Sequence, residues 1–265
     1  MAKAGVVSSG IVGYSHASVP ALWSVFAPVF KGVATENNVV CLSQVTPMLA
    51  DGTALTGDGK VFAYVLSDTT YGVYGSPYMW YSSLGGWSLD GTTKIGNTDV
   101  VLTVGAGFAV YNNVKVKNGV ESTAKGSTNT AIGFLVSGAV DLVCQNAIPV
   151  LWSVSGNNSP VQRYLSDFTP TLPDGTALTG DGKVFVYMLS DTTYGVYGTP
   201  YMWYSSLGGW SLDGTTKIAD NAVVFAAGEG FAVYNNVKMK NGVESTAKGS
   251  TNTAIIFNTT SLLSE

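Results

Sequence analysis

The residues best suited to hold a ligand are aromatic, and they occur in two equivalent runs. The runs are Tyr71, Tyr74, Tyr78, Trp80, Tyr81, Trp87 and Tyr194, Tyr197, Tyr201, Trp203, Tyr204, Trp210. Exposed rings stack on sugars or anchor protein interfaces, whereas buried rings pair across strands in a core. Tyr78 and Trp80 would share one face of a strand and Tyr81 the other, so one face could be exposed. The pattern allows a core role or a binding surface, and the candidate surface residues are Tyr78, Trp80, Tyr81, Trp87, Tyr201, Trp203, Tyr204 and Trp210.

Most acidic residues stand in turn contexts. Asp51, Asp58 and Asp90 each precede a glycine, and the first two pairs recur at Asp174 and Asp181. A calcium loop needs several oxygen ligands at alternate positions, closed by a bidentate acid. No acid lies between Asp51 and Asp58, and Asp-Gly pairs are typical of turns. The pattern favours turns over a calcium site, and we predict neither a metal nor a cofactor.

His16 is the single histidine of the chain. A Ser-His-Asp triad or a histidine-based zinc site around it would have no counterpart in the second copy of the repeat described below. Paired carboxylates for glycoside hydrolysis are available by number, but the acids stand in turns. We therefore predict no catalytic residues and a protein that is not an enzyme.

Cys41 and Cys144 do not occupy equivalent positions of the two copies. They are either two buried free thiols or a disulfide. A disulfide would close a loop of about 100 residues and contribute ~4–5 kcal/mol in the chain-entropy model.

Two glycine pairs look like the start of a phosphate loop: Gly105 and Gly107 in VGAGF, and Gly228 and Gly230 in AGEGF. A phosphate loop continues into a helix. Here FAVYNN follows, which is typical of a strand and a turn, so we predict a bulge or tight turn at these glycines.

The candidate residues recur because most of the chain is present twice. Residues 51–134 align with 174–257 without a gap, at an offset of 123 (174 − 51), and 71 of 84 positions are identical. Upstream, VPALWSV at 19–25 aligns with IPVLWSV at 148–154, and LSQVTPML at 42–49 with LSDFTPTL at 165–172. No Pro-rich or Gly/Ser-rich linker separates the copies. We predict two domains of about 125 residues, 1–134 and 135–265, with a rigid junction.

Each copy has the pattern of a series of short strands. Lys60–Leu66 is a run of β formers, Leu84–Gly86 separates two aromatic strands, and Asn118-Gly119 is a strong hairpin signal. Helical periodicity is nearly absent, although Pro20–Val33 has room for a turn or two of helix. We predict an all-β fold, with each copy a β-sandwich or barrel-like domain.

Charge excludes one class of partner. Charged residues make up 11% of the chain, and the net charge is −4. Nucleic-acid binding needs a basic face, and a single arginine, Arg163, is present. No apolar run reaches the ~18–20 residues of a membrane helix, so we predict no membrane span. A surface this poor in charge suits an extracellular or densely packed setting, or an ordinary domain with a Ser/Thr/Asn surface.

The order of the motifs adds a resemblance. GIVGY, a strand ending in LWSV, an L-S-x-x-T-P segment, DGTALTGDGKVF, an aromatic strand with GGW, and GEGFAVYN follow one another. This order resembles the uncharacterised β-rich modules of secreted proteins from the planctomycete–verrucomicrobium group of bacteria, and it covers both copies. The resemblance implies an extracellular or cell-surface protein. Residues 1–14 lack a signal-peptide core, so the chain either stays in the cytoplasm or is a mature form with an added start Met, and the resemblance favours the mature form.

Two functions are open at this point. Near-identical copies, a rigid junction and low charge favour a structural or surface-assembly protein, whose sheet edges pair with further subunits. The doubled aromatic strand favours a carbohydrate-binding or adhesive module. We therefore expect self-association, or a glycan or surface partner.

Overall fold

The computed structural model describes residues 12–27, 40–65, 76–97, 99–102, 107–139, 145–157, 162–188 and 199–259. Side chains are described for these residues except 12–17, 40, 137–139 and 145. The described chain is all-β, as predicted, and its helical elements are two 3-10 turns, η1 (Leu42–Gln44) and η2 (Leu165–Asp167). Neighbouring strands in the sheets run antiparallel.

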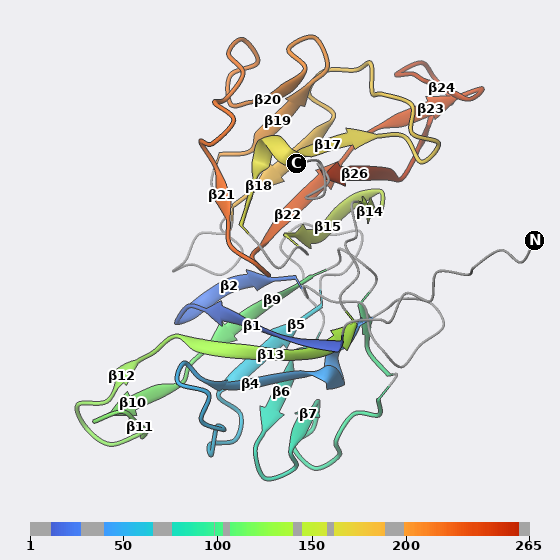
Figure 1. The fold of residues 1–265 in the computed structure, drawn as a ribbon. Helices are drawn as coiled ribbons and strands as arrows, with labels where there is room; N and C mark the ends of the chain where they lie inside the picture. Colours follow the sequence, from blue (N-terminus) through green and yellow to red (C-terminus); the bar gives the residue numbers. More distant parts are fainter. Residues whose placement is uncertain are drawn as a thin grey trace, which may run out of the picture.

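The strands within residues 12–139 form a main three-stranded sheet and a five-stranded sheet, with two smaller sheets, one of three short strands and one of two (Figure 1). The three-stranded sheet has the order β1-β13-β4, with β1 at Val12–Val19, β13 at Ile132–Ala139 and β4 at Val45–Leu49. The five-stranded sheet has the order β2-β9-β5-β6-β7, with β2 at Leu22–Phe26, β9 at Phe108–Asn112, β5 at Val61–Tyr64, β6 at Tyr78–Tyr81 and β7 at Gly86–Ser88. The smaller sheets are β3 (Val40–Cys41) with β8 (Val101–Leu102), and the order β11-β10-β12, with β10 at Lys115–Lys117, β11 at Val120–Glu121 and β12 at Thr128–Asn129.

The strands within residues 145–259 repeat these orders. The three-stranded sheet is β14 (Gln145–Ile148), β26 (Ile255–Thr259) and β17 (Phe168–Thr171). The five-stranded sheet is β15 (Leu151–Gly156), β22 (Gly230–Asn235), β18 (Val184–Tyr187), β19 (Tyr201–Tyr204) and β20 (Gly209–Ser211). The smaller sheets are β16 (Arg163–Tyr164) with β21 (Val224–Phe225), and the order β24-β23-β25, with β23 at Lys238–Lys240, β24 at Val243–Glu244 and β25 at Thr251–Asn252.

Turn chemistry explains where two hairpins reverse. Asn118 and Gly119 have φ of 54° and 79°, the left-handed values that a two-residue turn between twisted strands requires. The predicted Asn-Gly hairpin is therefore confirmed, as β10 and β11. The predicted reversal around Leu84–Gly86 is also confirmed, because β6 and β7 pair there with Tyr81 opposite Gly86.

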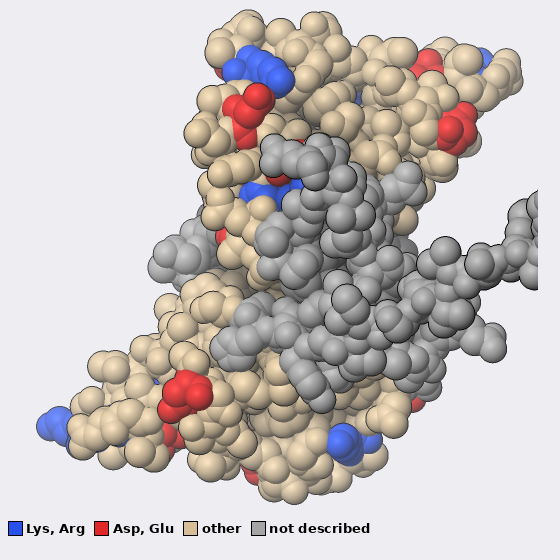
Figure 2. Space-filling model, viewed as in Figure 1, with Lys and Arg blue, Asp and Glu red and all other residues tan. Residues whose placement is uncertain are grey.

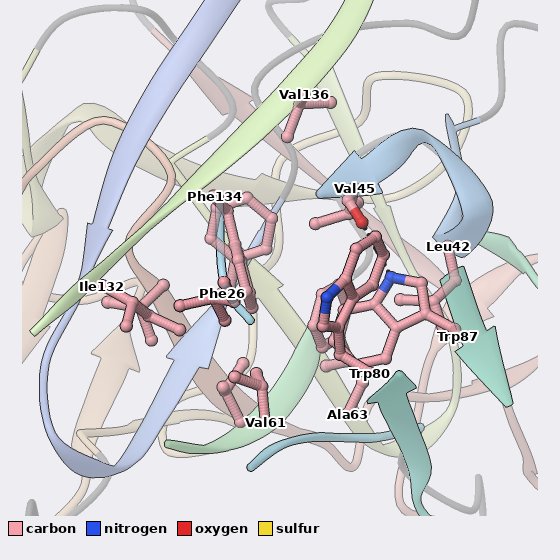
Figure 3. Close-up of a cluster of buried hydrophobic side chains, with 14 of the residues drawn as sticks. Phe26, Leu42, Val45, Val61, Ala63, Trp80, Trp87, Ile132, Phe134 and Val136 are labelled. Carbon is pink, nitrogen blue, oxygen red and sulfur yellow. Dashed lines mark hydrogen bonds between the residues drawn. The ribbon is translucent and has the colours of Figure 1, made fainter. Parts of the chain in front are cut away.

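The three-stranded and five-stranded sheets of each set pack face to face around a hydrophobic core. Phe134 of β13 lies between the layers, with its ring centroid 4.9 Å from that of Phe26 and 6.1 Å from that of Phe108 (Figure 3). The buried residues of this first cluster all lie within 19–136. A separate cluster, confined to residues 148–257, fills the second set of sheets.

The chain crosses from one layer to the other at Pro20–Leu22. Leu22 has a φ of 67°, which is uncommon for a residue with a β-carbon. The buried side chain of Asn112 holds this corner, because its Nδ2 donates to the carbonyl oxygens of Pro20 at 3.1 Å and Thr130 at 2.9 Å. Leu22–Phe26 then pair with β9 as a strand. The helical turn expected within 20–33 is therefore wrong for residues 22–26, and residues 28–33 lie outside the described part.

Strand β13 connects the two sets of sheets along the sequence. It pairs over its full length with β1, from Ile132 opposite Val19 to Ala139 opposite Val12. The boundary predicted between residues 134 and 135 thus lies within a strand of the first set. The second set begins with β14.

Candidate binding surface

The structure corrects the surface prediction for Trp80, Trp87, Trp203 and Trp210, which lie in the hydrophobic cores with exposed fractions of 8%, 0%, 9% and 1%. Trp80 and Trp87 are opposite each other on β6 and β7, with ring centroids 5.7 Å apart (Figure 3). The Nε1–H of Trp87 donates to the carbonyl oxygen of Val45 at 2.7 Å, which ties the five-stranded sheet to β4. The register of β6 and β7 turns this pair towards the other layer and removes it from solvent.

The four predicted tyrosines are half-buried. Tyr78 and Tyr201 pack against the two cores. Tyr81 lies beneath a turn, because a β-carbon added at Gly91 would be 2.7 Å from its hydroxyl oxygen. Tyr204 lies against Gly214 in the same way. The remaining tyrosines of the two runs lie outside the described residues; they are Tyr71, Tyr74, Tyr194 and Tyr197.

A different aromatic group lies on the outer face of each five-stranded sheet. The ring centroid of Trp23 is 4.9 Å from that of Tyr111 and 5.2 Å from that of Tyr64. Phe62 continues the group, 5.8 Å from Tyr111. The second set repeats it with Trp152, Phe185, Tyr187 and Tyr234. All eight side chains are half-buried, and we call each group an outer aromatic face.

Sequence reasoning missed the outer aromatic faces because their members are distant in the chain. One signal was present: Phe62 and Tyr64 alternate with two buried residues, which marks them as one face of a strand. Joining them to Trp23 required the register that sets Tyr111 opposite both Trp23 and Phe62.

The acidic turns use their carboxylates as hydrogen-bond acceptors. Asp90 accepts the backbone N–H groups of Thr92 and Thr93, both at 2.8 Å, and the hydroxyl of Ser88 at 2.9 Å. These donors lower the pKa of Asp90 below its ordinary value. Donors of the same kind lower the pKa at Asp51, Asp58, Asp174, Asp181 and Asp213. A general acid needs a raised pKa, so these carboxylates are built as turn acceptors.

The remaining polar candidates are partly outside the described residues. Where side chains are described, no group of three or more His, Cys, Asp or Glu is arranged to hold a metal ion. Cys41 is a buried free thiol, and burial raises its pKa. The free-thiol alternative is therefore the one found at Cys41, while Cys144 lies outside the described residues. His16 is on β1 opposite Leu135, and its side chain is not among those described.

A hollow of about 320 Å³ lies where the two sets of sheets meet. One wall comes from residues 18–20 and 23–26, and the other from Met188 and residues 226–230. Among the described residues that line it, Glu229 alone carries a charge. Its carboxylate accepts the N–H of Ala226 at 2.8 Å, and partial burial raises the pKa of Glu229.

The described chain contains no helix with the length and apolar character that a membrane crossing requires. No protein-family model, curated protein or solved structure matches this chain.

Proposed function

We propose that the chain is a non-enzymatic structural protein of the cell exterior, built from two tandem copies of one all-β domain. The proposed protein assembles through surfaces that it carries twice. Support for the duplication comes from 71 identical positions in 84 and from matching strand orders. Separate hydrophobic clusters within 19–136 and 148–257 support two domains. The proposed domain boundary lies between Ala139 and Gln145.

The observation that carries the assembly proposal is a pair of exposed valines on two projecting arms. The arms are the small three-stranded sheets of residues 115–129 and 238–252, at opposite ends of the molecule (Figure 1). Val120 is 67% exposed and Val243 63%. The two arms differ at one of 15 positions, Val116 against Met239. Two equal contacts that point apart generate an open chain of molecules rather than a closed pair.

Each arm is anchored at its base by a carboxylate. The Oε2 of Glu121 accepts the N–H of Thr56 at 2.7 Å, the N–H of Gly57 at 3.1 Å and the hydroxyl of Thr56 at 3.1 Å. Glu244 makes the equivalent contacts in the second arm. Charge-assisted hydrogen bonds are roughly twice as strong as neutral ones. The arm therefore holds its valine in a defined position.

The described surface of the chain suits close association. On the face shown in Figure 2, charged side chains are few within the described part. Two further aliphatic side chains per copy are exposed at equivalent positions: Leu89 and Leu212 at 49% and 46%, and Val101 and Val224 at 48% and 43%. A weakly charged surface opposes the approach of a second molecule less than a highly charged one does.

Sedimentation velocity over a range of concentrations, with electron microscopy of the concentrated protein, tests this function. We expect the wild-type chain to form extended assemblies and Val120→Lys with Val243→Lys to be monomeric. Val120→Lys alone should stop at dimers, because one arm remains. Thr123→Lys with Thr246→Lys adds the same charge to exposed arm positions and should assemble as wild type. A wild-type chain that stays monomeric, or control and valine variants that behave alike, would refute assembly through the arms.

The outer aromatic faces support a second candidate function, carbohydrate binding. Half-buried aromatic rings in mutual contact offer an apolar surface on which a sugar ring could pack, and two such faces per chain would give avidity. Trp23→Ala with Trp152→Ala should abolish retention on a glycan array, while the arm variants keep it. Binding that is absent in the wild type, or unchanged in the tryptophan variant, removes this candidate.

A further inference from the structure

The two sets of sheets contact each other through backbone on both sides of the joint. Phe26, at the end of β2, forms an antiparallel bridge with Glu229, just before β22. The N–H of Ala27 donates to the carbonyl oxygen of Gly228 at 2.8 Å. In the other direction, the N–H of Gly107 donates to the carbonyl oxygen of Val154 at 3.1 Å.

The close approaches of valine and glycine at the joint are reciprocal when equivalent positions of the repeat are compared. Val25 corresponds to Val154 (25 + 129) and Gly107 to Gly230 (107 + 123). A β-carbon added at Gly107 would lie 2.7 Å from Val154 Cγ1, and one added at Gly230 would lie 2.5 Å from Val25 Cγ1. Each copy therefore inserts the same valine against the same glycine of the other copy.

One contact joins a position to its own counterpart. Ala27 corresponds to Gly156 (27 + 129), and a β-carbon added at Gly156 would lie 2.7 Å from Ala27 Cβ. A position that meets its own equivalent lies on a two-fold axis, and reciprocal contacts around that axis define an isologous interface. In a heterologous joint, the two copies would use different patches.

The joint also explains a glycine of the GxGF motif. Gly107, Gly230 and Gly156 are not among the residues with positive φ, so their backbone conformation does not demand glycine. A β-carbon added at Gly107 or Gly156 would lie 2.5 Å from a backbone oxygen of its own copy, and at all three glycines an atom of the neighbouring copy also lies within 2.7 Å. The predicted tight turn is confirmed at Gly228, which has a φ of 78°, while the equivalent Gly105 lies outside the described residues.

From this reciprocity we infer that the joint is a homodimer interface, whose partner is a second copy of the same domain. The inference rests on the tandem domains of the proposed function, but not on assembly through the arms. Within one chain the interface is filled by the other copy. When the covalent link is cut, each domain becomes free to pair with its own kind.

The two possible homodimers differ at the axis. A pair of second domains brings Gly156 against Gly156, which leaves room. A pair of first domains brings Ala27 against Ala27, and a β-carbon at the Gly156 position already stands 2.7 Å from Ala27 Cβ. The second domain should therefore pair with itself more readily than the first.

The test uses the folded full-length chain with a protease site inserted between β13 and β14. The chain carries Val120→Lys and Val243→Lys, so that pairing through the arms is removed. After cleavage, native mass spectrometry should show the two halves still paired. After dilution and reconcentration, it should also show a species with twice the mass of the second half. A second half found only alone, or only with the first half, overturns the inference.

Two variants localise the contact. Val25→Lys leaves the second half unchanged, so it should shift the population from mixed pairs to pairs of second halves. In a pair of second halves, Val154→Lys places two like charges opposite each other and should lower the affinity of the pair by about tenfold or more. Thr246→Lys adds the same charge on the second arm and should leave pairing as in the parent. Circular dichroism of each intact chain verifies folding, and equal pairing in Val154→Lys and Thr246→Lys contradicts the assigned interface.

Discussion

The hydrogen bond from the Trp87 side chain to the Val45 carbonyl links the two layers, so the stability that this packing contributes can be measured by removing it. Trp87→Phe keeps an aromatic ring in the core but removes the Nε1–H that donates to the Val45 carbonyl at 2.7 Å. A buried carbonyl that loses its donor costs ~1–3 kcal/mol. The ring centroid of Trp87 lies 5.7 Å from that of Trp80 and 6.2 Å from that of Phe134. The smaller phenylalanine ring would leave a gap beside them, which costs about 1 kcal/mol of stability. The free energy of unfolding should therefore fall by about 2–4 kcal/mol.

Guanidinium unfolding followed by far-UV circular dichroism measures this loss. Trp210→Phe is the matched variant of the second set, because its Nε1–H donates to the Phe168 carbonyl at 2.8 Å, and it should lose a similar amount. Trp23→Phe makes the same substitution on the half-buried outer aromatic face and should cost less than about 1 kcal/mol. A loss below about 1 kcal/mol for Trp87→Phe, or one equal to that of Trp23→Phe, would refute the packing argument.

Three further predictions concern the arm, a turn and the buried thiol. Glu121→Gln removes the charge that anchors the first arm, so hydrogen exchange at the Thr56 amide should accelerate while exchange in the core strands stays unchanged; equal protection of Thr56 in both proteins contradicts the anchor. Because turn donors lower the pKa of Asp90 in the folded chain, the unfolded chain binds the proton first, and stability should fall as the pH drops below about 4. Asp90→Asn should flatten this acid slope in urea midpoints taken from about pH 6 to pH 2, and an unchanged slope counts against the turn assignment. In a Cys144→Ser background, Cys41 should react with a thiol reagent only in denaturant, because it is 2% exposed; rapid reaction of the native protein would show that this site is open.

Short-range signals in the sequence were sufficient to predict the all-β fold class. Alternating apolar residues and Asn-Gly turns are short-range signals, so the hairpin at Asn118-Gly119 and the reversal before Trp87 were predictable. The strand at Leu22–Phe26 was not, because β2 is defined by its pairing with the distant β9. Likewise, the extent of β13 depends on its partner β1, more than 100 residues earlier in the chain.

Which aromatic side chains of the candidate site are exposed could not be predicted from the sequence. The alternation of Tyr78, Trp80 and Tyr81 assigns these side chains to two faces of a strand. It does not show which of the two faces packs against the other layer. That choice depends on the register of β6 with β5 and β7 and on where the three-stranded sheet packs. The outer aromatic faces could not be predicted as groups because the residues of each face come from three strands that are distant in the sequence.

By itself, the sequence determined that the chain is rich in short strands and that one segment of it occurs twice, since both properties are read from neighbouring residues and from alignment. Tertiary structure alone decided that the tryptophans at 80 and 87 are core and that the glycine at 107 faces the second copy. The physical reason is that a strand has two equivalent sides and two unpaired edges. Burial and contact are settled only when distant strands and the neighbouring copy occupy them.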